Sequence, residues 1–200
     1  MEYYYLALIF AISFASNATP FFGAPYTVIS STILLKFGLT PLNFAEVVVA
    51  SGIGAGIAKS VMYGIGYGVG TKLKDNRNVS FFHRIIKGRS FYLAIFITSV
   101  MPFFPFDDFV FLIGGAGKAS LLKMLEITIP SKVLKSSLEI GIEAEGLLQI
   151  GKITKISPVE LGVISSVIFV ILGVVLFKID WEKLYLRVER YFRQRSWTNP

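Results

Sequence analysis

The chain contains no cysteine among its 200 residues, and it contains a single histidine. The lack of cysteine excludes a disulfide scaffold and any thiol chemistry, and one histidine leaves little room for a histidine-based metal or acid–base centre. Charged residues are also scarce, at 16% of the chain compared with about 25% in soluble domains. With 54% hydrophobic residues, the composition predicts a membrane protein and excludes both disorder and a soluble nucleic-acid binder, despite the net charge of +7.

The apolar runs are too irregular for a simple series of spanning helices. Residues 3–35 and 91–106 carry no charged side chain, yet prolines interrupt both runs. We therefore predict an all-α integral membrane bundle with two proline-broken, re-entrant hairpins, which enter the bilayer from opposite faces in inverted orientation. The expected elements are helices over about residues 3–16, 42–71, 120–149 and 158–178, and hairpins over about residues 20–38 and 91–117.

Two basic segments predict the orientation of the chain. Residues 74–89 form an expected interfacial amphipathic segment, and residues 179–200 form an expected basic, aromatic tail. Because cytoplasmic segments carry an excess of lysine and arginine, both are expected on the cytoplasmic side. Residues 1–178 would then form a membrane domain in the plasma membrane, with the N- and C-termini cytoplasmic. A secretory signal peptide is the alternative for the first helix, and the acidic Glu2 disfavours it.

A short repeat occurs in the two predicted hairpins. Residues 19–25 read Thr-Pro-Phe-Phe-Gly-Ala-Pro and residues 101–105 read Met-Pro-Phe-Phe-Pro, so a Pro-Phe-Phe core recurs after 82 residues. Paired broken segments in two halves of a chain indicate the binding site in inverted-repeat transporters. A chance match in a phenylalanine-rich chain is the alternative. The prolines that we assign to the predicted site are Pro20, Pro25, Pro102 and Pro105.

The predicted helix over residues 42–71 carries a ridge of small residues. Such a ridge lets another membrane helix approach the backbone closely. The spacing does not fit a nucleotide-binding loop, because Ala58 precedes Lys59 where a phosphate loop requires glycine. The ridge recurs every fourth residue at Gly52, Gly56, Ser60, Gly64 and Gly68, with Gly54, Ala58, Gly66 and Gly70 alongside.

Charged residues within the predicted bundle are the candidate binding groups. On a helical wheel, Thr128, Lys132, Lys135, Ser136, Glu139 and Glu143 share a sector of roughly 100°, and Val133, Leu134, Leu138 and Ile140 lie on the opposite arc. We expect the polar sector to face inward, because a charge at bilayer depth costs about 2.5–3.5 kcal/mol. An ordinary solvated face is the alternative.

Lys59 lies deep in its predicted helix and needs a counter-charge for the same reason. We predict an ion pair with Asp107 or Asp108, which follow the second proline break. In the alternative, Lys59 extends to the headgroups and the two aspartates cap the next helix. If one carboxylate titrates in this site, proton-linked transport becomes a candidate.

Residues 17–150 resemble the DedA/VTT-domain family, also called the SNARE-associated Golgi protein superfamily. The resemblance rests on a proline-led first hairpin, on Tyr63, Gly66 and Gly70 at the end of the glycine-rich helix, and on Pro102, Pro105 and Asp107, followed by Gly114 or Gly115. It also implies a helix break comparable to Pro130. The chain departs from the family pattern at four places: Ala58-Lys59 replaces Gly-Asp, Thr27 replaces an acid, and Ser99 and Pro105 replace arginines.

The resemblance implies movement of lipids between leaflets, either scrambling of phospholipids or recycling of polyprenyl phosphate. Independently, Lys59, Lys132 and Lys135 would suit an anionic phosphate headgroup. An ion- or proton-coupled secondary transporter of a small solute is the alternative, and a scaffold that recruits partners through its tail is the third. We expect neither enzymatic activity nor a cofactor, metal ion or nucleic-acid partner. Formation of a homo-oligomer is compatible with the sequence.

Overall fold

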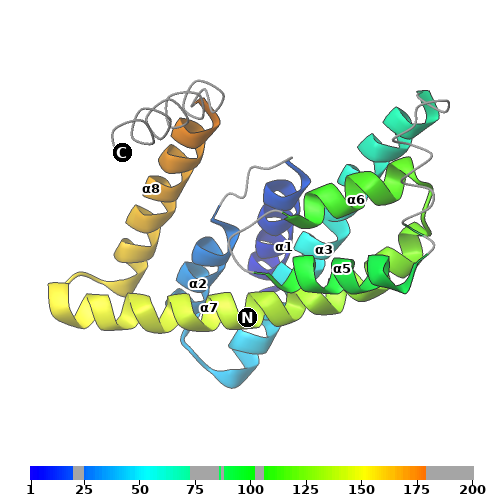
Figure 1. Ribbon diagram of the computed structural model, residues 1–200. Helices are drawn as coiled ribbons and strands as arrows, with labels where there is room; N and C mark the ends of the chain where they lie inside the picture. Colours follow the sequence, from blue (N-terminus) through cyan, green and yellow to red (C-terminus); the bar gives the residue numbers. More distant parts are fainter. Residues whose placement is uncertain (20–24, 73–85, 87, 102–105, 179–200) are drawn as a thin grey trace, which may run out of the picture.

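The computed structural model describes residues 1–19, 25–72, 86, 88–101 and 106–178, and within them it contains seven helices and no strand. The prediction of an all-α chain is therefore confirmed for this part of the chain. The segments expected at 74–89 and 179–200 lie almost entirely or entirely outside the described residues. The helices, labelled as in Figure 1, are α1 (Tyr3–Ala18), α2 (Tyr26–Phe37), α3 (Pro41–Lys72), α5 (Arg89–Val100), α6 (Phe106–Ala116), α7 (Leu121–Thr154) and α8 (Pro158–Lys178).

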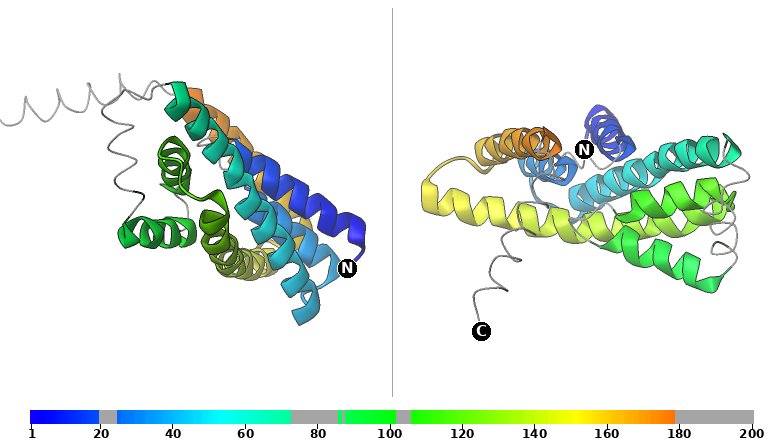
Figure 2. Two further views of the ribbon diagram at one scale, coloured as in Figure 1. Left: turned by 90° about the vertical axis from the view of Figure 1, so that its right-hand side faces the viewer. Right: turned by 45° about the horizontal axis from the view of Figure 1, so that its top comes forward.

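The two longest helices, α3 and α7, form the centre of the structure. The helix expected over residues 120–149 continues to Thr154 as α7, and it runs the length of the molecule in Figure 1, with α8 folding back beside α2 at one end. Helices α1 and α6 pack on α3, while α5 packs on α7 near the opposite end. Figure 2 shows the same arrangement from two other sides. Every other helix therefore contacts one or both of these two helices.

The order of helices is repeated in the two halves of the chain. Helices α1, α2 and α3 are followed by α5, α6 and α7, so each half has two short helices and then a long one. The contacts repeat as well, because α1 packs on α3 as α5 packs on α7. The second short helix of each half packs more on the long helix of the other half than on that of its own half: α2 on α7, and α6 on α3. The halves are thus interlocked by an exchange of equivalent helices.

Pro130 does not break its helix, contrary to the expectation from the family resemblance. Helix α7 is continuous from Leu121 to Thr154, with Pro130 inside it. Proline removes one backbone hydrogen bond of the helix, and neighbouring helices often stabilise such a position in membrane proteins. Here α3 packs directly beside the proline, because Gly56 lies against Ile129. The helix therefore continues through the proline at a point where it packs against α3.

Glycines bring α3 into backbone contact with three other helices. A Cβ atom added to Gly52 would lie 2.5 Å from the Cα of Val133 in α7, and one added to Gly54 would lie 2.5 Å from the carbonyl oxygen of Phe10 in α1. Near the end of α3, a Cβ atom on Gly70 would lie 2.5 Å from the carbonyl oxygen of Ala116 in α6. Small residues permit this close approach, as expected for membrane helices.

The predicted ridge is wrong at two positions. Gly64 and Gly68 are exposed, and nothing within the described residues lies within 4 Å of a Cβ atom added to either. The reason is geometric: an α-helix has 3.6 residues per turn, so a series of every fourth residue rotates by about 40° at each step. After Gly56 the series turns away from the neighbouring helices, and Gly66 and Gly70 take over the contact.

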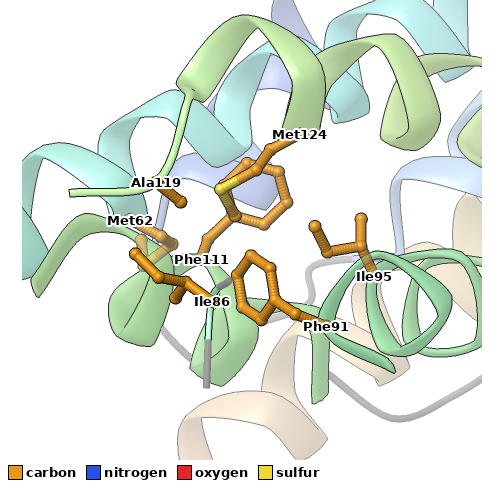
Figure 3. Close-up of a cluster of buried hydrophobic side chains, with 7 residues drawn as sticks. All are labelled: Met62, Ile86, Phe91, Ile95, Phe111, Ala119 and Met124. Carbon is orange, nitrogen blue, oxygen red and sulfur yellow. The ribbon is translucent and has the colours of Figure 1, made fainter. Parts of the chain in front are cut away.

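Two hydrophobic clusters flank the centre. One lies between α3, α5, α6 and α7, and Figure 3 shows its residues: Met62, Ile86, Phe91, Ile95, Phe111, Ala119 and Met124. The other joins α1, α2, α3 and α7 and is formed by Ile9, Leu34, Val47, Val48 and Ile140. Ile140 was expected on the arc opposite the polar sector, and it is instead fully buried because α1, α2 and α3 surround this part of α7.

Among the described residues, one helix is both long and apolar enough to cross a bilayer, judged on length and composition: α3, with 32 residues. Helices α1, α2 and α5 and the stretch Pro158–Ile168 are apolar but shorter.

Candidate functional site

The polar sector of α7 faces the interior. Thr128 and Ser136 have no exposed surface, and Lys132 is 2% exposed. On the opposite arc, Leu134 and Leu138 are 47% and 55% exposed. The alternative of an ordinary solvated face is therefore wrong for this helix.

Four charged side chains from three helices meet at the centre. The Nζ atom of Lys59 in α3 lies 2.5 Å from Oδ1 of Asp108 and 3.4 Å from Oδ2 of Asp107, both in α6. The same Oδ2 atom of Asp107 lies 2.7 Å from Nζ of Lys132 in α7. All four residues are 3% exposed or less, so Lys59 does not extend to the surface. The structure thus joins Lys59 to both aspartates, and Asp107 links it to Lys132.

The glycine contacts between α3 and α6 position these charges. Gly66 lies against the backbone of Leu112 and Gly70 against that of Ala116, while Gly115 of α6 lies against the carbonyl oxygen of Tyr63. The two helices therefore run in the same direction with their backbones touching. This contact brings the first turn of α6, which contains both aspartates, beside Lys59. Carboxylates in the first turn of a helix are also favoured by the helix dipole.

The charged stripe continues along α7 toward the surface. Lys135 and Glu139 lie one turn apart, with Nζ and Oε1 separated by 3.8 Å, and their side chains are 10% and 13% exposed. Counting this pair, three lysines face three carboxylates: Lys59, Lys132 and Lys135 against Asp107, Asp108 and Glu139. Removing one partner of a buried pair is strongly destabilising, because the other charge is left uncompensated.

A second polar cluster lies farther along α7, and the sequence prediction missed most of it. Glu143 accepts hydrogen bonds from Thr27 Oγ1 to its Oε1 atom, at 2.8 Å, and from Ser31 Oγ to its Oε2 atom, at 3.0 Å. Thr27 and Ser31 lie one turn apart on α2, in a helix whose hydroxyl residues are largely buried. The run Tyr-Thr-Val-Ile-Ser-Ser-Thr at 26–32 was the available signal, because five hydroxyl residues in a short apolar helix need partners.

The remaining predicted site residues are placed as follows. Pro20, Pro102 and Pro105 lie outside the described residues, and Pro25 immediately precedes α2. Tyr63 has a packing role: its hydroxyl donates a hydrogen bond of 2.7 Å to the carbonyl oxygen of Ala119. Within the described residues, no group of three or more histidine, aspartate or glutamate side chains is arranged to hold a metal ion.

Comparison with known proteins adds no relative to this description. No protein-family model, curated protein sequence or solved structure matches the chain. The resemblance to the DedA/VTT family therefore stands on the sequence motifs alone, and a function has to be argued from the geometry of the two polar clusters.

Proposed function

We propose that the protein is an integral membrane protein that moves phospholipid or polyprenyl-phosphate headgroups between leaflets. The observation that carries the proposal is the buried network of Lys59, Asp107, Asp108 and Lys132, within a chain whose outer side chains are largely apolar. Charges held at such a cost inside an apolar bundle are typical of transport pathways. We also propose membership of the DedA/VTT family on the quoted motifs.

The exposed apolar side chains support a membrane environment. Large exposed apolar patches are unfavourable in water and are typical of surfaces that contact lipid or a partner. The charged side chains described above lie inside the same bundle, which reverses the usual arrangement of a soluble domain. Exposed apolar residues occur on most of the helices, including Ile65 and Val69 on α3, Leu93, Phe96 and Ile97 on α5, Phe106 and Phe109 on α6, Leu134, Leu138 and Ile142 on α7, and Val163 and Val167 on α8.

We propose that residues 20–38 and 91–117 are re-entrant hairpins that enter from opposite faces. The lengths of α2, α5 and α6 support this, because helices of 12, 12 and 11 residues extend roughly 16–18 Å. A hydrocarbon core is about 30 Å thick, so none of the three spans it alone. The exchange of α2 and α6 between the halves is also the pattern that an inverted repeat would produce.

The polar stripe supplies a pathway of suitable length. From Thr128 to Glu143 it follows α7 for about 22 Å, which is most of the hydrocarbon thickness of about 30 Å. The lysine ammonium groups along this stripe can bind the oxygens of a phosphate as they bind the oxygens of a carboxylate. A phosphate headgroup would therefore exchange places with Asp107 beside Lys132 and then contact Lys135, while its acyl or prenyl tails stay in lipid.

An ion- or proton-coupled transporter of a small solute is the second candidate. The balance of three lysines against three carboxylates, with four of the six residues almost inaccessible, favours it. In such a balanced network, an ion or a proton enters or leaves only when a lysine or a carboxylate changes its partner. We propose that either activity operates in the plasma membrane with both termini cytoplasmic, as the basic segments 74–89 and 179–200 indicate.

Reconstitution into liposomes tests the proposal. We expect the purified chain to accelerate the exchange of fluorescent phospholipid or polyprenyl phosphate between leaflets, and we expect Lys132→Met to abolish the acceleration. The matched control is Lys152→Met, which removes an exposed lysine of the same helix and should leave exchange unchanged. Failure of the folded wild-type protein to accelerate exchange of either lipid would refute lipid transport. Dissipation of an ion gradient without lipid exchange would support the second candidate instead.

A further inference from the structure

Glu143 differs from the other carboxylates of the interior in lacking a basic partner. Within the described part of the chain, no lysine or arginine nitrogen lies within 4.0 Å of it, whereas Asp107, Asp108 and Glu139 each contact a lysine. Its described partners are the neutral hydroxyls of Thr27 and Ser31. Glu143 is partly buried, and a carboxylate withdrawn from water without a counter-charge is costly, which favours uptake of a cation or a proton at this position.

The atoms around Ser31 are rich in acceptors and poor in donors. Its Oγ atom lies 2.9 Å from the carbonyl oxygen of Thr27, 3.4 Å from that of Ile140 and 3.0 Å from Oε2 of Glu143. A serine hydroxyl has one hydrogen to donate, so it satisfies one of these three oxygens at a time. The two carbonyl oxygens already accept backbone hydrogen bonds within α2 and α7, and each keeps a second lone pair. Carboxylate, hydroxyl and carbonyl oxygens gathered in this way are the ligand types that hard cations prefer.

Two further buried hydroxyls belong to the same two helices, α2 and α7. Tyr26 OH and Ser136 Oγ are buried, and among the described residues neither has a partner in hydrogen-bonding geometry. This part of the interface between α2 and α7 therefore holds several oxygen atoms and, in Glu143, a carboxylate with no basic partner among the described residues.

We propose that Glu143, Thr27 and Ser31 form a binding site for a monovalent metal cation such as Na⁺. One carboxylate with neutral hydroxyl and carbonyl oxygens neutralises a single positive charge, whereas sites for Ca²⁺ usually supply several carboxylates. The proposal goes beyond lipid transport, because the ligand is an ion and the site lies apart from the network around Lys59. It stands whether or not the chain moves lipids.

The full-length chain, purified in detergent, is the material for the test. We expect it to retain radioactive sodium, and we expect its thermal midpoint to be higher in sodium chloride than in choline chloride of equal ionic strength. Glu143→Gln keeps the shape of the side chain and removes the charge, so both effects should disappear. The matched control is Glu145→Gln, because Glu145 is exposed on the same helix and its carboxylate accepts a hydrogen bond from Gln149; this variant should bind sodium like the wild type.

Two milder variants keep the test decisive if Glu143→Gln fails to fold. Thr27→Val and Ser31→Ala each remove one hydroxyl and leave the carboxylate in place. We expect each to weaken sodium binding by at least about 10-fold, the loss typical of removing even a group that only supports a metal ligand.

The proposal is overturned if wild-type protein retains no sodium at neutral or alkaline pH and has the same thermal midpoint in both salts, which would indicate a proton at Glu143. It is also overturned if Glu143→Gln, or both hydroxyl variants, bind sodium like the wild type. Sodium binding is measured without transport, so its failure is separate from failure of lipid exchange.

Discussion

Replacing Gly66 by alanine would insert a methyl group into the contact between α3 and α6. The new Cβ atom would lie 2.8 Å from the carbonyl carbon of Leu112 and 2.9 Å from its Cα atom, and closer still to its oxygen. Carbon atoms in favourable contact are about 3.5–4.0 Å apart. All three nearest atoms belong to the backbone, so no rotation of a side chain relieves the overlap. Helix α6 would have to move away by roughly 1 Å.

The cost of this displacement follows from comparison with Gly64, two residues earlier in the same helix. Nothing within the described residues lies within 4 Å of a Cβ atom at Gly64, so Gly64→Ala changes the helix propensity alone. Alanine is favoured over glycine in a helix by about 0.8–1.0 kcal/mol, and this gain is common to both variants. The difference between Gly66→Ala and Gly64→Ala is therefore the overpacking cost, about 1–3 kcal/mol. One to two kcal/mol of this lowers the ratio of folded to unfolded protein by about 5- to 30-fold.

Thermal or denaturant-induced unfolding of the two purified variants measures this difference. We expect Gly64→Ala to match or slightly exceed the stability of the wild type, and Gly66→Ala to be clearly less stable. Because Lys59 and Asp108 join the same two helices, the displacement should also weaken their ion pair. Equal stability of the two variants would refute the reasoning, since it would show that α3 and α6 are not in backbone contact at Gly66.

Three further substitutions test the ion network, a hydrogen bond and a helix cap by the same unfolding measurements. Lys132→Met should cost about 3–5 kcal/mol, because it leaves Asp107 with only the longer contact to Lys59, at 3.4 Å; adding Asp107→Asn should recover part of the loss, and strictly additive costs would contradict the network. Tyr63→Phe should cost about 0.5–1.5 kcal/mol through its hydrogen bond of 2.7 Å, and an unchanged stability would argue against that bond. Ser120→Ala should cost about 0.5–1 kcal/mol, because Ser120 caps the first turn of α7 with a long bond of 3.5 Å; a loss of several kcal/mol would show a role beyond capping.

The pairing of Lys59 was predictable, while its full set of partners was not. A lysine in the middle of an apolar helix requires a counter-charge, and two consecutive aspartates after a proline break were the nearest candidates in kind. Nothing in the local sequence shows that both carboxylates contact the lysine, or that Asp107 also contacts Lys132. That arrangement depends on α6 and α7 meeting α3 at the same level, which is a property of the packed helices.

The second cluster escaped prediction because its members look ordinary on their own. Thr27 and Ser31 lie in an apolar helix, where hydroxyls often bond to the preceding turn of the same helix. Ser31 does contact the carbonyl oxygen of Thr27, yet it also reaches Glu143, 112 residues later in the chain. Such a contact follows from α2 packing on the long helix of the other half of the chain.

Composition and periodicity alone determined that the chain is helical, that the polar residues from Thr128 to Glu143 share one face of α7, and that this face points inward. These properties are local: they depend on the transfer free energy of each side chain and on the 3.6-residue turn. Tertiary structure alone decided which small residues of α3 touch a neighbour and which carboxylate receives a lysine. Both depend on the rotation and crossing of helices far apart in the sequence, because a shift of one turn or about 40° brings different atoms into contact. Gly64 and Glu143 show this: within the described residues Gly64 has no neighbour where its spacing predicted one, and Glu143 is held by hydroxyls from the opposite half of the chain.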